Sequence, residues 1–178
     1  MSESGSSAGD SASSLALLLP YFNSPENTPS PSSHADDPTS KTAAELIRIS
    51  RSFEDLIQNG PEDELASLAA RYIHPNFTAR LANDLPVLGS WEEYVRVLRI
   101  WINSNPGYQK SIVATACNVE EEEREASVYI CIEVTGWPVQ LKRLVVSVLK
   151  WKLRKRKWLC YDNSVMRGID MFSTAAEG

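Results

Sequence analysis

The sequence predicts a single α+β domain over residues 41–172, in which three helices precede and cover a curved antiparallel sheet. Two observations support this fold class. Apolar residues recur at helical spacing up to about residue 104 and alternate with a period of two after Gly107. Helices and strands are also grouped along the chain rather than interleaved, which favours an α+β arrangement over a parallel βαβ design.

Residues 1–40 differ from the rest of the chain and predict a disordered, acidic tail. They hold twelve serines and five of the 10 prolines, and they contain no Lys or Arg. Such a segment cannot bury enough apolar surface to offset the entropy of ordering it. Its apolar island at 15–19 fits the LxxLL pattern of partner-docking helices, although an inert patch is the favoured interpretation. A second, short tail is predicted at residues 173–178.

Capping signals mark where the three helices begin. Thr42 and Glu45 form a capping box for the first helix. Pro61 occupies the first position of the second helix, and Ser90 is the N-cap of the third. Turn or breaker residues end the helices at 59–60, 74–75 and 105–107.

Four segments rich in Val, Ile, Cys, Tyr and Trp predict strands. They span 111–119, 126–135, 142–153 and 158–165. Short connections between them are typical of antiparallel hairpins. A further short strand could lie within 77–88, where Pro86 and Gly89 interrupt the pattern.

Four stretches of this sequence give it a family resemblance. They are Tyr72-Ile73-His74-Pro75-Asn76-Phe77, Ser90-Trp91-Glu92-Glu93-Tyr94, Asn105-Pro106-Gly107-Tyr108 and the closing hairpin over 145–162. In order and spacing the chain resembles the nuclear transport factor 2-like (NTF2-like) superfamily, and within it the SnoaL-like branch. It departs from the family's frequent Asp-Gly-Lys turn, since residues 154–157 are all basic.

The resemblance implies a cone-shaped domain with an apolar cavity that opens at one end. It also implies a choice among polyketide cyclases, dehydratases, steroid isomerases, epoxide hydrolases and members that only bind or dimerise. Most of these need no metal or organic cofactor, so none is expected here. Fold alone does not select one of these functions.

Hairpin pairing makes Asp162 the first catalytic candidate. If 154–157 is a four-residue loop, Asp162 pairs with Leu149 and faces the cavity. An apolar environment would raise the pKa of this carboxyl toward that of a general base. The bland alternative is that Asp162 pairs with Arg167 or caps the strand end. A slip of one residue would instead turn Asp162 outward and leave Tyr161 and Asn163 inside.

His74 is the second catalytic candidate, because the resemblance places it at the cavity mouth and its ordinary pKa suits proton transfer. A structural histidine is the alternative. Glu133 is a rival acid if its face of the strand is concave, although such a residue is more often solvated or paired across the sheet. Residues expected to contact a ligand are Tyr72, Asn76, Arg80, Trp101, Tyr108, Tyr129, Glu133, Trp151 and Trp158.

Charge and cysteine usage restrict the partners. The net charge of −5 belongs to the acidic tail, so the domain is formally neutral and has no overall field toward nucleic acid or an anionic membrane. The basic run over 150–157 is interpreted as a solvated strand end beside the acidic 120–125 turn, in preference to a nucleic-acid or nuclear-localisation patch. The three cysteines have no metal-ligand spacing and predict buried, reduced thiols in an intracellular protein.

Two functions follow as hypotheses. The first is a cofactor-independent enzyme that cyclises, isomerises or dehydrates a small apolar metabolite, with Asp162 as base and His74 as acid or orienting group. The second is a non-catalytic module that binds a ligand or forms a homodimer through the outer face of its sheet. No apolar run in the sequence is long enough for a membrane span.

Overall fold

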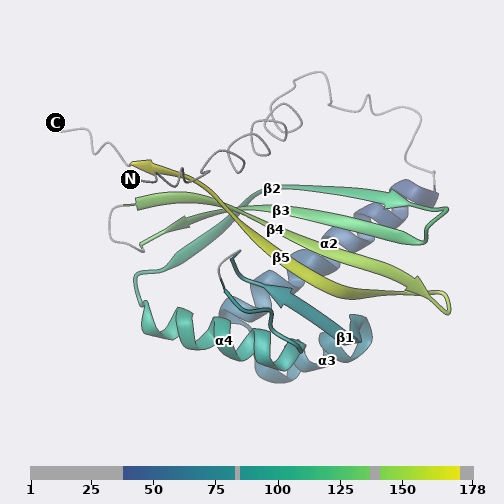
Figure 1. Ribbon diagram of the computed structural model, residues 1–178, viewed down its shortest axis with the longest axis horizontal. Coiled ribbons are helices and arrows are strands. Elements are labelled where there is room, and N and C mark those ends of the chain that lie inside the picture. Colours follow the sequence, from purple (N-terminus) through teal and green to yellow (C-terminus); the bar gives the residue numbers. More distant parts are fainter. Residues whose placement is uncertain (1–37, 83–84, 137–140, 173–178) are drawn as a thin grey trace, which may run out of the picture. The chain divides into compact units, whose positions relative to one another are not determined.

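The computed structural model describes residues 38–82, 85–136 and 141–172 (Figure 1). Most of the predicted N-terminal tail, the 15–19 island and the C-terminal tail lie outside these ranges. The elements are α2 (Pro38–Asn59), α3 (Glu62–Tyr72), β1 (Ile73–Arg80), α4 (Trp91–Ser104), β2 (Gln109–Glu120), β3 (Glu125–Thr135), β4 (Leu141–Arg154) and β5 (Lys157–Phe172).

The five strands form one sheet in the order β1-β5-β4-β3-β2. The hairpins β2–β3, β3–β4 and β4–β5 are antiparallel, as the short connections predict. β1 is parallel to β5 and adds an edge strand earlier than the 77–88 segment suggested. The predicted α+β class, with three helices and an antiparallel-dominated sheet, is confirmed, although β1 lies between α3 and α4 instead of after all the helices.

The sheet has an inner face toward the helices and an outer face away from them. Figure 1 shows α3 and α4 below the sheet, with α2 running behind its strands. Even-numbered residues of β3, such as Val128 and Ile130, are fully buried on the inner face. They belong to one core with Phe53 of α2 and Trp91 of α4, because alternate strand residues and one helix stripe meet there.

The helix starts only partly follow the capping signals. α2 begins at Pro38, so the predicted capping box of Thr42 and Glu45 lies inside the helix and does not start it. At α4 the prediction is confirmed, because Ser90 Oγ accepts a hydrogen bond from the Glu93 N–H at 3.1 Å. The Glu93 carboxylate also accepts one from the Gly89 N–H at 3.0 Å, which satisfies a second backbone donor at this helix end.

The predicted register of the last hairpin is correct as far as Trp151, which pairs with Cys160. Beyond that point it is wrong. Lys150 pairs with Asp162, because Tyr161 is an extra residue that forms a β-bulge. The bulge exchanges the two faces, so Asn163 points inward and is 2% exposed. Asp162 therefore lies on the outer face.

Residues with positive φ lie at both ends of the sheet. The β4–β5 connection has two residues instead of the predicted four, since Arg154 pairs with Lys157. Its central residues Lys155 and Arg156 have φ values of 47° and 65°, the left-handed region that type I′ turns require and non-glycine residues disfavour. At the opposite end, Gly136 has φ 82° and lies so close to Gly107 that a Cβ would be 1.7 Å from its carbonyl oxygen.

Candidate functional site

A cavity of about 290 Å³ lies between α2, α4 and the inner face of the sheet. Most of its lining is aliphatic or aromatic, and its polar side chains are Glu54, Tyr94, Tyr108, Lys110, Arg143 and Ser147. Small-molecule sites have this character, with an apolar wall and a few convergent polar groups. The inner cavity is therefore the candidate site.

An ion pair is built into the cavity wall. Glu54 Oε2 lies 2.7 Å from Lys110 Nζ, and each side chain is 7% exposed. Lys110 also donates to the Glu54 carbonyl oxygen at 2.8 Å. Glu54 follows Ser50 by one turn on the buried stripe of α2, and Lys110 precedes Ile112 on the inner face of β2.

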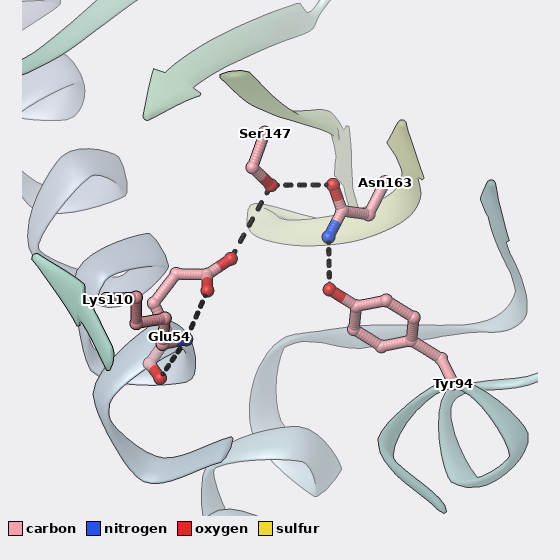
Figure 2. Close-up of polar contacts among 5 residues, drawn as sticks. All are labelled: Glu54, Tyr94, Lys110, Ser147 and Asn163. Atoms are coloured by element: carbon pink, nitrogen blue, oxygen red, sulfur yellow. Dashed lines mark hydrogen bonds and ion pairs between the residues drawn. The ribbon is translucent and has the colours of Figure 1, made fainter. Parts of the chain in front are cut away.

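A chain of hydrogen bonds continues from this pair across the sheet (Figure 2). Ser147 Oγ donates to Asn163 Oδ1 at 2.9 Å and lies 3.5 Å from Glu54 Oε1. Asn163 Nδ2 then donates to the Tyr94 hydroxyl oxygen at 2.8 Å. The chain joins α2, β4, β5 and α4, so it fixes four elements around one polar side of the cavity.

Both tyrosines of the cavity are held in their neutral form. Burial raises the pKa of Tyr94 well above its usual value, and the negative charge of Glu54 adds to the increase. Burial and the Glu54 charge likewise raise the pKa of Tyr108 to about 12. A phenol with such a pKa remains a hydrogen-bond donor throughout the neutral range.

The pair has hydrogen-bonding capacity left over. A lysine ammonium has three N–H donors, and the described residues account for two of those on Lys110, both directed to Glu54. The third donor and the remaining carboxylate lone pairs can serve a ligand. The cavity can thus offer a cationic donor and an anionic acceptor side by side.

The cavity includes two of the residues predicted from sequence. Trp101 and Tyr108 line it and pack edge to face, with ring centroids 4.4 Å apart. Asp162 lies instead in an outer depression with Arg80, where it accepts hydrogen bonds from Thr78 Oγ1 at 2.8 Å and Ser164 Oγ at 3.0 Å. The Asp162 carboxylate therefore has its hydrogen-bond donors on the outer face and does not reach the inner cavity.

His74 is also outside the cavity. It lines a separate groove of about 860 Å³ between α3 and α4, and its Nδ1 accepts a hydrogen bond from the N–H of exposed Asn76 at 3.0 Å. This groove is larger than the inner cavity, but α4 turns a different face to it, with Arg96, Arg99 and Ile100. The two catalytic candidates therefore do not come together.

The other predicted ligand contacts are dispersed. Trp151 is fully buried in the core and stacks on Phe53, with the two ring centroids 6.4 Å apart. Tyr129 and Glu133 lie on the outer face, where Glu133 forms an ion pair with Lys142 at 2.7 Å. Tyr72 and Trp158 line a third cleft, at the end of α3.

Sequence reasoning missed the pair that defines the site. Glu54 falls within the apolar stripe of the first helix, and a charged residue in such a stripe is a signal for a buried partner. The sequence predicts this strand only from residue 111, whereas β2 begins at Gln109, so Lys110 belongs to the strand and alternates with Ile112. The alternative register predicts that Tyr161 and Asn163 both face inward. The bulge turns only Asn163 inward, and Tyr161 lines the outer depression with Asp162.

The cysteines carry free thiols of low acidity. Burial raises the pKa of Cys117 to about 11, and it also raises the pKa values of Cys131 and Cys160. Thiols of this kind are weak nucleophiles at neutral pH. Across the described ranges, no three His, Cys, Asp or Glu side chains gather closely enough to hold a metal ion. Nor does any described helix have the length and apolar character to cross a membrane.

No protein-family model matches this chain, and no curated protein matches it. Solved structures do. An NTF2-like protein of unknown function from Pseudomonas putida aligns with a TM-score of 0.56 and 8% identity, over 74% of this chain and 90% of the other. A proposed dehydratase of the NTF2-like family from Streptomyces avermitilis aligns with a TM-score of 0.53 and 15% identity. The alignment covers 72% of this chain and 97% of the other.

A third match is the association domain of CaMKII from C. elegans, with a TM-score of 0.53, 13% identity and coverage of 73% and 98%. At these identities the likeness concerns the fold alone. It agrees with the architecture derived above, in which helices cover one face of a mixed sheet and enclose a cavity.

Proposed function

From an NTF2-like fold with a polar pair in an apolar cavity, we propose that this chain binds a small, mostly apolar molecule with one oxygen-containing group. The observation that supports the proposal is the Glu54–Lys110 pair, 7% exposed on each side, in the cavity wall. A buried ion pair contributes little net stability, because desolvation offsets the attraction. Its spare donor and acceptor suit a ligand oxygen instead.

The chemistry that this arrangement suits is proton transfer beside a carbonyl. The carbonyl oxygen would accept a hydrogen bond from Lys110, and Glu54 would remove a proton from the neighbouring carbon. The C–H electron pair moves into a C=C bond, and the charge that develops on oxygen is stabilised by the ammonium group. Return of the proton from Glu54 to another carbon completes an isomerisation without a cofactor.

A ligand screen tests the binding proposal. Apolar ketones and alcohols of limited size are added to the full chain, and the melting temperature is followed. We expect hits that stabilise the wild type and the Asp162→Asn variant, since Asp162 lies outside the cavity. Val145→Phe, which fills the cavity, should abolish the shift while its circular dichroism spectrum stays native. A hit that stabilises Val145→Phe equally would contradict binding in the cavity.

Proton transfer has its own readout. A ketone that binds should exchange its α-hydrogens in D₂O, followed by NMR, faster with wild type than with Glu54→Gln. Equal exchange by the two proteins, when both bind the ketone, would leave a binding module without catalysis. The fold match to a proposed dehydratase is consistent with a catalytic role and does not identify the reaction.

The outer face of the sheet favours a second function, self-association. Tyr129 and Cys131 of β3 and Met166 of β5 keep part of their surface exposed on this face. They lie beside Val146 and Val148 of β4, which are buried at 4% and 8% exposed. Ion pairs of Glu133 with Lys142 and of Glu125 with Lys152 lie at either end of β3. An apolar centre with a charged rim is typical of a homodimer interface.

Light scattering on a size-exclusion column tests this association. We expect a dimer for the wild type and a monomer for Met166→Glu, because Met166 is 37% exposed and can accept the charge without unfolding. The matched control is Ile100→Glu on the outer side of α4, which is 57% exposed. A wild-type monomer at concentrations near 100 μM would contradict the proposal.

A further inference from the structure

A third cleft, of about 380 Å³, lies along the N-terminal part of α2, ahead of the turn that carries Glu54. Three elements that are distant in sequence form it: the first turns of α2, the end of α3 and the start of β5. Its lining residues are Thr42, Glu45, Leu46, Ile49, Ala70, Arg71, Tyr72, Arg156, Lys157 and Trp158. The proposed function makes no use of this cleft.

Positive charge converges on the cleft. Arg71, Arg156 and Lys157 line it, against a single lining carboxylate, Glu45. Glu45 is 4.0 Å from Arg48, so it has another cation beside it. Within the described part of the chain, neither Arg156 nor Lys157 forms an ion pair, and both are exposed. The cleft therefore has a surplus of cations directed at solvent.

The neighbouring acidic turn does not neutralise these cations by contact. A backbone hydrogen bond from the Leu153 N–H to the Arg124 carbonyl oxygen, 2.8 Å long, does connect the two hairpin ends. However, Glu121 accepts a hydrogen bond from Thr39 at the start of α2, where the helix dipole favours negative charge. The basic side chains are thus left for a partner outside the described residues.

Two aromatic rings complete the cleft. The guanidinium carbon of Arg71 lies 5.3 Å from the centroid of the Tyr72 ring, which fixes the cation at one wall. Trp158 is half-buried, so part of its indole ring faces the space between the cations. Cations beside an accessible aromatic face are the elements that bind a phosphate together with a base.

We propose that this cleft binds a nucleotide, either free or as a unit of a single-stranded nucleic acid. Arg71, Arg156 and Lys157 hold the phosphate, and Trp158 contacts the base. Sequence alone favoured a solvated strand end here, since it could not bring Arg71 and Tyr72 to the basic turn.

Fluorescence anisotropy with the full chain tests the proposal. A fluorescein-labelled oligo(dT) of fifteen nucleotides is titrated with protein at several salt concentrations. Unlabelled AMP, oligo(dT) and inorganic phosphate are then added separately as competitors for the labelled strand. Where each of the three cations neutralises one phosphate of the oligo(dT) strand, the slope of log K against log salt should be about −2. Tighter binding of oligo(dT) than of AMP assigns the site to a strand, and equal binding assigns it to a free nucleotide.

A pair of matched variants locates the site. Arg156→Gln with Lys157→Gln removes two cleft cations and should weaken binding at least tenfold. Lys155→Gln with Arg154→Gln removes the same charge from the same turn, but neither residue lines the cleft, so the loss should be under threefold. Equal losses in the two variants, or competition by inorganic phosphate as strong as by AMP, would overturn a nucleotide site. No binding at 50 mM salt would also overturn it.

Discussion

The Glu54 carboxylate and the Lys110 ammonium group lie 2.7 Å apart within a mostly apolar wall. They come from α2 and β2, on opposite layers of the domain. Because so little water reaches either group, each needs the other for charge compensation. This dependence can be measured separately from any ligand.

Removing one member of the pair should be strongly destabilising. We expect Glu54→Gln to lower the free energy of unfolding by about 3–5 kcal/mol, because Lys110 is then buried without a counter-charge. Urea denaturation measures the loss. Changing both, as Glu54→Gln with Lys110→Met, should cost less than the sum of the two single changes by more than about 1 kcal/mol. Strict additivity would mean that the pair is not formed.

The turn between Lys155 and Arg156 should gain stability from residues that tolerate left-handed backbone. We expect Lys155→Asn with Arg156→Gly to raise the free energy of unfolding by about 1 kcal/mol, since Asn-Gly is the preferred type I′ sequence. As a control, the same replacement by Ala-Ala keeps the strain and should give no gain. Thermal unfolding of the three proteins compares them, and a gain for Ala-Ala would point to charge repulsion instead.

Gly136 should be irreplaceable, because a Cβ there would overlap the Gly107 carbonyl and its φ of 82° disfavours other residues. Gly136→Ala is expected to destabilise the domain by more than about 2 kcal/mol. Gly89→Ala is the matched control, since a Cβ at that position meets no atom within 4 Å. Chemical denaturation of both variants checks the difference, and equal stability would exclude this close approach of the two backbones.

Alkaline pH should weaken the fold through Tyr108. Its pKa is raised to about 12 in the folded protein, mainly by burial, from an ordinary value near 10. Between these values the unfolded chain loses a proton that the folded chain keeps, so stability falls as pH rises from 10 toward 12. The melting temperature of Tyr108→Phe should decline less steeply over this range. Parallel curves for the two proteins would contradict the raised pKa.

The periodicity of the sequence was sufficient for the fold but insufficient for the site. Ser90 and the places of the hairpin connections depend on local chemistry, so they could be predicted, although the last connection is two residues shorter than expected. Asp162 and His74 depended on tertiary detail that no local pattern contains. One extra residue in β5 turned Asp162 outward, and α4 separates His74 from the inner cavity. Glu54 required knowing that Lys110, 56 positions later, would lie opposite it.

The bulge at Tyr161 divides β5 into two segments whose inward residues have opposite parity, with Cys160 before it and Asn163 after it. Deleting Tyr161 would make the pairing regular and leave Asp162 opposite Lys150 and Asn163 opposite Leu149, because the bulged residue has no partner of its own. The side chains that face the cavity would therefore be the same after its loss. The last strand can change its length at this one position and keep the same residues inside the domain.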